Sequence, residues 1–208
     1  RSAVDTEQFK TPSDRVAFQV EFNLSNTDIV LATVAQLIPR KGHRYMLEAV
    51  AQLKNSYPHL KVIIFGQGSL EAALRKQTAK LGLEETVKFS GYRQDLDDYL
   101  TCLDLLIHPA LTEGLGVAAL KASAAGVPVV GFAAGGLSEV VSNGETGLLV
   151  PPKDVEALRV AITKLIEDPA LRRKFGDAGR LRMQHDFSIE SMVDDHVQLY
   201  ESILNVTS

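Results

Sequence analysis

The amino-acid sequence predicts an α/β domain with a Rossmann-like, doubly wound parallel sheet of about six strands and helices at its C-terminal end. Short apolar, β-branched segments alternate with segments whose apolar residues recur at helical spacing. Glycine-rich or charged loops follow the predicted strands, as in sheets whose parallel strands are joined by right-handed crossovers. Because no repeat or linker divides the 208 residues, we expect a single domain.

The first half of the chain shows this alternation of strands and helices. A threonine followed by Pro12 is a typical helix start, which predicts a short helix over residues 12–23. An apolar stripe that includes Met46 and Leu53 predicts a second helix. A third helix is expected to end at Gly82, because glycine commonly terminates helices. The predicted strands are residues 29–34, 61–65 and 86–89.

The second half continues the alternation. Residues 95–103 are predicted to form a short helix and residues 105–107 a strand. This strand leads into a loop with glycines and then into a helix of small apolar residues closed by Gly126. Further strands are predicted at residues 127–132 and 147–150.

The last quarter of the chain is predicted to be helical. An apolar stripe from Val155 to Leu165 predicts a helix that ends at Pro169. Phe187 and Ser188 are expected to begin another helix. Its apolar stripe is predicted to pack in the core and consists of Val193, Val197, Tyr200 and Leu204.

The composition limits the classes of partner. The net charge is −4 and no long basic run is present, so a nucleic-acid partner is not expected. The only cysteine, Cys102, lies in an apolar stretch, which predicts a packed thiol in a reducing compartment. No stretch is long and apolar enough to span a bilayer, and nothing resembles a signal peptide. The chain begins at Arg1 rather than Met, so we expect a piece of a longer protein.

The strongest functional signal follows the strand at residues 105–107. Glu113, Gly114 and Gly116 lie between this strand and the next predicted helix. Such a loop places free backbone N–H groups and the positive end of the helix dipole at the carboxyl edge of the sheet, where phosphate binds. The Glu113 carboxylate is expected to accept hydrogen bonds from hydroxyl groups such as those of a sugar. The alternative is that Glu113 caps the following helix.

Several segments, in their order and spacing, resemble the donor-binding half of retaining glycosyltransferases of group 1, family 4, which have the GT-B fold. These segments are residues 39–42 (PRKG), 66–68 (GQG), 91–93 (GYR), 113–116 (EGLG), 125–130 (AGVPVV), 135–141 and 144–152. The resemblance implies that residues 1–208 are the C-terminal nucleotide-sugar-binding domain of such an enzyme. It also implies that residues 1–10 are the interdomain connector, and that the last helix, residues 188–205, crosses toward an N-terminal acceptor-binding domain of the same chain.

The resemblance also implies roles for individual residues. Lys41 would bind the donor diphosphate, and the backbone amides of Gly116 and Val117 would hold its distal phosphate. Glu113 would bond a hydroxyl of the transferred sugar, which makes Lys41 and Glu113 the catalytic candidates. No metal and no other cofactor is expected, because the lysine and the helix dipole stabilise the charge on the leaving diphosphate. The other implied donor-binding residues are Arg40, Gly66, Tyr92, Arg93, Gly114, Leu115 and Lys121.

Two positions depart from the family pattern. The family usually has a second Glu, which bonds the ribose, where this chain has Lys121, and an ammonium group cannot accept a hydrogen bond. A Gly-Arg pair is common where Ala35 and Gln36 stand, so Arg40 or Lys121 would have to supply the second cation. A noncatalytic nucleotide-sugar-binding or scaffold domain is therefore the alternative function. A nicotinamide-dependent oxidoreductase is disfavoured, because no complete Gly-x-Gly-x-x-Gly motif follows a strand.

The implied activity is retaining transfer of a hexose from a UDP or GDP sugar to a saccharide or lipid-linked acceptor, as in polysaccharide biosynthesis. Because acceptor contacts belong to the other domain, the isolated chain is expected to bind the nucleotide sugar without turnover. The implied location is the cytoplasm, at the inner face of the cytoplasmic membrane, with peripheral membrane association through the other domain. Among the histidines, His108 is expected to pack, and His43, His185 and His196 to be solvated.

Overall fold

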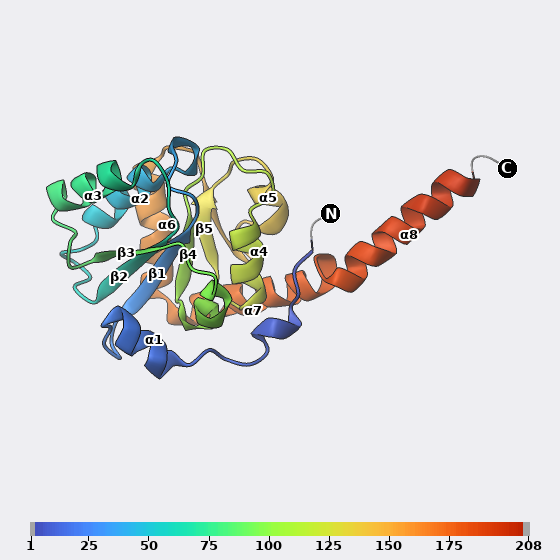
Figure 1. Ribbon diagram of the computed structural model, residues 1–208, viewed down its shortest axis with the longest axis horizontal. Coiled ribbons are helices and arrows are strands. Elements are labelled where there is room, and N and C mark those ends of the chain that lie inside the picture. Colours follow the sequence, from blue (N-terminus) through green and yellow to red (C-terminus); the bar gives the residue numbers. More distant parts are fainter. Residues whose placement is uncertain (1–2, 206–208) are drawn as a thin grey trace.

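The computed structural model describes residues 3–205. The strands within this range are β1 (Ile29–Val34), β2 (Leu60–Phe65), β3 (Val87–Gly91), β4 (Leu105–His108), β5 (Val129–Phe132) and β6 (Gly147–Val150). These six described strands form one parallel sheet in the order β3-β2-β1-β4-β5-β6 (Figure 1). The predicted Rossmann-like, doubly wound sheet is confirmed.

The direction of winding reverses between β1 and β4. From β1 the chain adds β2 and β3 on one side, and it then returns to add β4, β5 and β6 on the other. Leu31 of β1 pairs with Leu105 of β4, so the loops that follow these two strands leave the sheet next to each other. The first loop leads to one face of the sheet and the second to the other. A parallel sheet forms its ligand crevice at such a switch point, outside the carboxyl ends of the strands.

Helices cover both faces of the sheet (Figure 1). One layer contains α2 (His43–Ala51), α3 (Glu71–Lys80) and α6 (Val155–Glu167). The other contains α1 (Arg15–Phe22), the 3-10 helix η3 (Leu96–Cys102), α4 (Val117–Ala124) and α5 (Leu137–Val140). Strand β1 shows why both faces are covered: Leu31 packs in the first layer and Val30 and Ala32 in the second, and all three are at most 2% exposed.

The first helix begins later than the predicted residues 12–23. The Asp14 side chain accepts a hydrogen bond from the Ala17 amide and caps α1, so the helix starts at Arg15. Pro12 lies in the segment before the helix. The predicted end at residue 23 is confirmed, because Asn23 adopts the left-handed conformation with φ 46°.

The helical last quarter is confirmed, but Pro169 has a second role. It begins α7 (Pro169–Asp186), where its missing N–H costs no helical hydrogen bond. Asp168 accepts a hydrogen bond from the Leu171 amide and caps this helix. α7 contacts both α4 and α6 and so joins the two layers. Two short 3-10 turns, η1 (Glu7–Phe9) and η2 (Pro39–Lys41), complete the assignment up to this helix.

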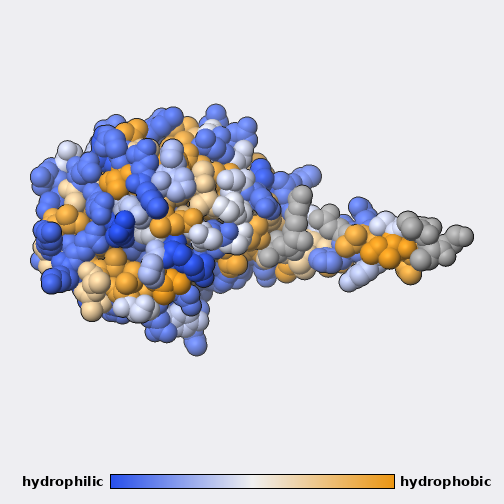
Figure 2. All heavy atoms as spheres, turned by 90° about the horizontal axis from the view of Figure 1, so that it is seen from above, coloured by the Kyte–Doolittle hydropathy of each residue, from blue (hydrophilic) through white to orange (hydrophobic). Residues whose placement is uncertain are grey.

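The last helix, α8 (Ile189–Asn205), projects away from the rest of the domain (Figure 1). Its apolar stripe was predicted to lie in the core, and this prediction is wrong: Val193, Val197 and Tyr200 are 49%, 46% and 62% exposed. Figure 2 shows apolar side chains gathered on this arm. The N-terminal segment packs at its base, where the Val4 amide donates to the Phe187 carbonyl at 2.8 Å. No helix in the described range is long and apolar enough to cross a membrane.

Candidate functional site

The loops after β1 and β4 meet at the switch point and hold each other by backbone contacts. The Leu111 amide donates to the Arg40 carbonyl at 2.8 Å. Gly42 has φ 68°, and a Cβ at this position would lie 1.9 Å from the Pro109 carbonyl oxygen. Only glycine permits both the conformation and the close approach. Lys41, the residue before it, is thereby held opposite the loop after β4.

The centre of the site is the carboxylate of Glu113. Its Oε2 lies 2.6 Å from Lys41 Nζ and 2.8 Å from His108 Nε2, and its Oε1 accepts a hydrogen bond from the Gly114 amide at 3.0 Å. The side chains of Lys41 and Glu113 are 12% and 10% exposed. The two residues that the sequence singled out therefore lie in direct contact at the edge of the crevice.

Hydrogen bonding keeps Glu113 ionised. The hydrogen bond from His108 and then that from Lys41 outweigh the effect of burial and lower the pKa of Glu113 from 4.5 to about 2. Glu113 is therefore an acceptor-only carboxylate at neutral pH. His108 is 3% exposed, so the expectation that it packs is confirmed. Its imidazole also orients Glu113, a role that the sequence did not reveal.

The N-terminus of α4 lies next to this carboxylate. Gly116 precedes the helix with φ 90°, and no side chain in the described range caps the helix there. A Cβ at Gly116 would lie 3.5 Å from Glu113 Cγ, which places the helix N-terminus beside the stem of the carboxylate. The alternative that Glu113 caps this helix is wrong. The uncapped amides and the helix dipole make this place suitable for an anion.

The loop between β5 and α5 packs directly against the backbone of the loop that carries Glu113. A Cβ at Gly135 would lie 1.9 Å from the Glu113 carbonyl oxygen, and one at Gly136 would lie 1.9 Å from the Gly114 carbonyl oxygen. The Gly136 amide also donates to the Glu113 carbonyl at 3.3 Å. These two glycines therefore allow one backbone to pack directly against another.

A cavity of about 330 Å³ opens beside the site, at the ends of β1, β2 and β3. Gly66 and Tyr92, two of the residues predicted to bind the donor, line this cavity. Tyr92 lies at the rim of the cavity and is 64% exposed. Gly66 packs against the loop after β1, where a Cβ would lie 1.9 Å from the Ala35 carbonyl oxygen. The full lining is Val34, Ala35, Gln36, Phe65, Gly66, Gln67, Tyr92, Arg93 and Leu96.

Arg93 lines this cavity with its charge already paired. Its Nε and Nη2 lie 2.7 and 2.5 Å from the Asp95 carboxylate, and it also pairs with Glu21 of α1. The Tyr99 hydroxyl lies 3.1 Å from Nη2. These partners, Asp95 first, raise the pKa of Arg93. The guanidinium therefore forms a wall of the cavity and ties it to α1.

Lys121 lines an adjoining cavity of about 320 Å³. The two cavities share the lining residues Val34, Tyr92, Arg93 and Leu96. Its Nζ lies 2.6 Å from Asp97 Oδ2, and the two side chains are 36% and 30% exposed. The position that the resemblance assigns to ribose binding thus holds an ammonium group with a carboxylate beside it. Asp97 was not predicted as a site residue, because the packing of η3 against α4 brings the pair together and no local motif encodes it.

The remaining predicted residues surround the Glu113 loop. Gly114 is exposed, Val117 is 59% exposed, and Leu115 is half-buried. Arg40 is exposed on the same turn as Lys41, and its guanidinium forms no ion pair within residues 3–205. No three carboxylate, imidazole or thiol groups of the described chain are grouped so that they could hold a metal ion.

The expectations for the other histidines are confirmed at two positions and wrong at one. The side chain of His185 is 92% exposed, and His196 is also exposed. His43 is 2% exposed instead of solvated, because it begins α2 at the point where the chain turns inward from Gly42. Cys102 is a buried free thiol, as predicted.

The family follows from a comparison with known sequence families. The model of the group 1 glycosyl transferases matches residues 14–182. The chain belongs to the group 1 glycosyltransferases. This group 1 glycosyltransferase chain is 33% identical, over 212 residues, to the GDP-mannose-dependent monoacylated alpha-(1-6)-phosphatidylinositol monomannoside mannosyltransferase of Corynebacterium glutamicum, covering 97% of this chain and 55% of the relative. It is 30% identical to the putative glycosyltransferase EpsD of Bacillus subtilis, covering 92% and 51%.

Solved structures place the glycosyltransferase chain in the GT-B fold. Anabaena Alr3699/HepE in complex with UDP matches with a TM-score of 0.88 and 26% identity, covering 96% of this chain and 56% of that one. The C-terminal domain of the group 1 family protein LpcC from Francisella tularensis matches in fold with a TM-score of 0.80 and 23% identity, covering 89% of this chain and 99% of that one. The chain thus spans about half the length of the curated relatives it matches.

Proposed function

We propose that the chain is the C-terminal donor-binding domain of a retaining glycosyltransferase of family 4, which transfers a hexose from a nucleoside diphosphate to a saccharide or lipid-linked acceptor. The observation that carries this proposal is the contact between Lys41 and Glu113, at 2.6 Å, beside the uncapped N-terminus of α4. A cation, a helix N-terminus and a hydroxyl acceptor lie at one switch point. The complex of HepE with UDP, a relative in fold and sequence, supports a nucleotide donor.

The donor diphosphate would lie between Lys41 and the N-terminus of α4. The Gly116 and Val117 amides would donate to the distal phosphate, and Lys41 would neutralise the diphosphate. When the glycosidic bond breaks, its electron pair moves to the diphosphate oxygen. Donors that are already in place stabilise this charge by a few kcal/mol each. Such an arrangement would allow transfer with no metal or other cofactor.

Glu113 would accept a hydrogen bond from a hydroxyl of the transferred sugar. The pKa of about 2 keeps it ionised, and the Gly114 amide and His108 fix its orientation. Lys41 now occupies Oε2, so a bound donor would draw the ammonium toward the diphosphate and leave that oxygen for the sugar. The acceptor hydroxyl would attack the sugar carbon on the face from which the diphosphate departs and would pass its proton to the diphosphate oxygen that gains the electron pair, which gives retention.

The nucleoside would occupy the two adjoining cavities. Tyr92 borders the larger one, where the base would stack, and Arg93 is fixed in its wall by Asp95. The ribose would lie at the second cavity, where Asp97 offers the carboxylate that Lys121 cannot provide. Gly66 would allow close approach of the donor to the end of β2. The Corynebacterium relative is GDP-mannose-dependent and HepE forms a complex with UDP-glucose, so both bases are candidates.

The other half of the enzyme would supply the acceptor site. Residues 1–10 would form the connector to it, and the apolar face of α8 would pack against it. We propose that the enzyme acts in the cytoplasm at the inner face of the membrane, held there by the other domain. The chain alone would bind the donor without transferring sugar.

Calorimetric titration of the chain with UDP, GDP, ADP and NAD tests the proposal. The proposal is supported if Glu113→Ala binds the UDP or GDP sugar more weakly than the wild type does but binds free UDP or GDP with the same affinity. Glu84→Ala is the matched control, because Glu84 is exposed in the turn before β3. This turn lies at the amino ends of the strands, away from the carboxyl ends where the donor site is proposed. Preferential binding of NAD would refute the donor assignment.

A noncatalytic sugar-nucleotide-binding domain is the second candidate, favoured by the pairing of Lys121 with Asp97. The two functions differ in turnover. The full-length protein, given a nucleotide sugar and acceptor lipid, releases nucleotide if it is an enzyme, and Glu113→Ala abolishes the release. Donor binding without release in the full-length protein identifies the noncatalytic alternative.

A further inference from the structure

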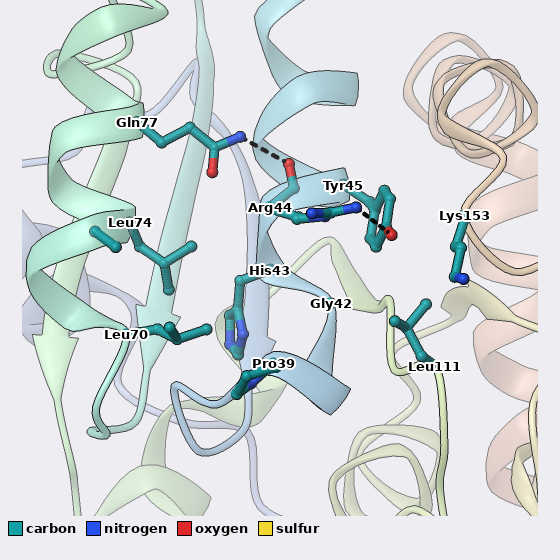
Figure 3. Close-up of a pocket in the computed structure, with 11 residues that line it drawn as sticks. Pro39, Gly42, His43, Arg44, Tyr45, Leu70, Leu74, Gln77, Leu111 and Lys153 are labelled. Atoms are coloured by element: carbon teal, nitrogen blue, oxygen red, sulfur yellow. Dashed lines mark hydrogen bonds between the residues drawn. The ribbon is translucent and has the colours of Figure 1, made fainter.

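A third cavity, of about 450 Å³, is lined by Pro39 of the turn η2 and by residues of α2 and α3 (Figure 3). It is called here the α2–α3 pocket, and it shares no lining residue with the two donor cavities. Its volume is in the range of small-molecule sites. Its lining residues are Pro39, Gly42, His43, Arg44, Tyr45, Leu70, Ala73, Leu74, Gln77, Leu111 and Lys153.

The charge in this pocket has one sign. Arg44 and Lys153 line it, and no Asp or Glu is among the lining residues. Neither cation forms an ion pair with any carboxylate of residues 3–205. The pocket also lies at the first turn of α2, a nine-residue helix whose N-terminus has no side-chain cap in the described chain. Two full charges and the positive helix end therefore face one cavity.

A buried side chain without a partner points to a ligand in the same pocket. His43 is 2% exposed, and neither of its ring nitrogens has a hydrogen-bond partner in the described chain. Figure 3 shows its ring between Leu70 and Pro39, on the wall of the pocket. Burial, followed by the charges of His108 and Lys41, lowers the pKa of His43 to about 4, so the neutral ring carries one N–H donor at pH 7.

The cationic side chain on α2 is held in position by its neighbours. Arg44 Nη2 donates to the Tyr45 hydroxyl at 2.6 Å, and its guanidinium carbon lies 4.4 Å from the centre of the Tyr45 ring. The Gln77 side chain donates to the Arg44 carbonyl at 3.1 Å, which ties α3 to α2 (Figure 3). On the facing side, Lys153 adopts φ 68°, a conformation that costs energy in a residue with a side chain. The pocket is therefore largely formed before a ligand binds.

We propose that the α2–α3 pocket is a binding site for a small phosphomonoester, separate from the donor site. The dianionic phosphate would face Arg44, Lys153 and the start of α2, because a dianion matches two cations better than a monocarboxylate does. The C–H face of the ligand's organic part, such as that of a sugar ring, would pack on Leu70 and Leu74. The two sites adjoin at Gly42, which separates Lys41 from His43 and packs against Pro109, where an added Cβ would lie 1.9 Å from the carbonyl oxygen.

Titration of the chain with glucose 6-phosphate, followed by calorimetry and by the NMR signals of the His43 ring, tests this proposal. Glucose is the neutral control ligand, and inorganic phosphate tests whether the anion alone suffices. Arg44→Met and Lys153→Met are each expected to weaken binding about tenfold, because each removes one charge-assisted contact. Lys174→Met, an exposed cation of α7 outside the pocket, is the matched control and should bind as the wild type does.

Lys41→Met separates this site from the donor site. If the phosphomonoester binds in the α2–α3 pocket, Lys41→Met retains the wild-type affinity while Lys153→Met weakens binding about tenfold. The opposite pattern, equal weakening in Lys174→Met, or binding of glucose as strong as that of glucose 6-phosphate would overturn the proposal. A titration without saturable heat or His43 shifts would overturn it as well. Circular dichroism of each variant shows whether a loss comes from unfolding.

Discussion

Lys41 Nζ lies 2.6 Å from Oε2 of Glu113, although 72 residues separate them in the chain. Each comes from a loop at the switch point, and both side chains are nearly covered by protein. The pair keeps a cation and an acceptor apart from bulk water at the place where a donor would bind. Such a contact is strong in isolation but exchangeable, because a diphosphate can replace the carboxylate as the partner of Lys41.

Lys41→Met should weaken binding of UDP or GDP about tenfold, or about 1.4 kcal/mol, because one charge-assisted contact with the diphosphate is lost. The thioether also removes the hydrogen bond and the charge of Lys41 from Glu113, so the pKa of Glu113 should rise. Calorimetry measures the first effect, with Lys174→Met as the control. Unchanged nucleotide affinity in Lys41→Met would remove Lys41 from the donor site.

The fold could be predicted because its strands are buried on both faces and read as apolar segments between glycine loops. Val62, Ile63 and Ile64 of β2 illustrate this, since all three are fully buried. The stripe of α8 shows the limit of the same reasoning. Periodicity states that Val193 and Val197 share a face, but it does not state what covers that face.

The candidate site could be predicted only where local sequence encodes geometry. Gly42 and Gly116 mark backbone conformations with positive φ, and Lys41 and Glu113 stand beside them. The sequence does not indicate Asp97 as a site residue, because its partner Lys121 is 24 residues away on another helix. The expectation that His43 is solvated is wrong for a related reason. A polar residue at a helix start is usually exposed, and only the tertiary structure places His43 beside Leu70 and buries it (Figure 3).

The burial of His43 predicts a pH dependence of stability. Its pKa is about 4 in the folded chain and 6.5 when unfolded, so between these values the unfolded state binds the additional proton. The free energy of unfolding should therefore be highest above pH 6.5 and fall by about 3 kcal/mol as the pH drops to 4. Urea denaturation at pH 7 and pH 4.5 measures this.

His43→Gln should reduce that fall, since the glutamine does not titrate. His185→Gln is the control, because its side chain is 92% exposed. The pKa of Glu113 is about 2 in the folded chain, below its usual value of 4.5. Its ionised carboxylate therefore stabilises the fold above pH 4.5, and this stabilisation is lost as the pH falls from 4.5 toward 2. Equal pH dependence in wild type and His43→Gln would show that the pKa of His43 is the same in the folded and the unfolded chain.

Asp97→Asn should reduce the preference for ribose over deoxyribose. Asp97 lines the cavity of about 320 Å³ that is proposed to hold the ribose; its carboxylate could accept hydrogen bonds from both ribose hydroxyls, whereas the amide offers a single acceptor oxygen. Affinity for UDP should fall about tenfold, while affinity for 2′-deoxy-UDP should change less. Asp98→Asn is a matched control, since Asp98 is the exposed neighbour outside the cavity. Equal loss for both nucleotides would assign Asp97 a structural role only.

Gly42→Ala and Gly91→Ala separate backbone strain from close packing. Both glycines have similar positive φ, 68° and 74°, so an alanine at either should cost about 1 kcal/mol through its conformation. At Gly91 no described atom lies within 4 Å of the added Cβ, whereas at Gly42 the Pro109 carbonyl oxygen would be 1.9 Å away.

Gly42→Ala must therefore move the loops after β1 and β4 apart. We expect it to destabilise the chain by about 2–4 kcal/mol and to weaken nucleotide binding through Lys41, while Gly91→Ala costs only the conformational part. Urea denaturation with parallel calorimetry measures both, and equal effects of the two substitutions would show that the contact between the loops does not position Lys41.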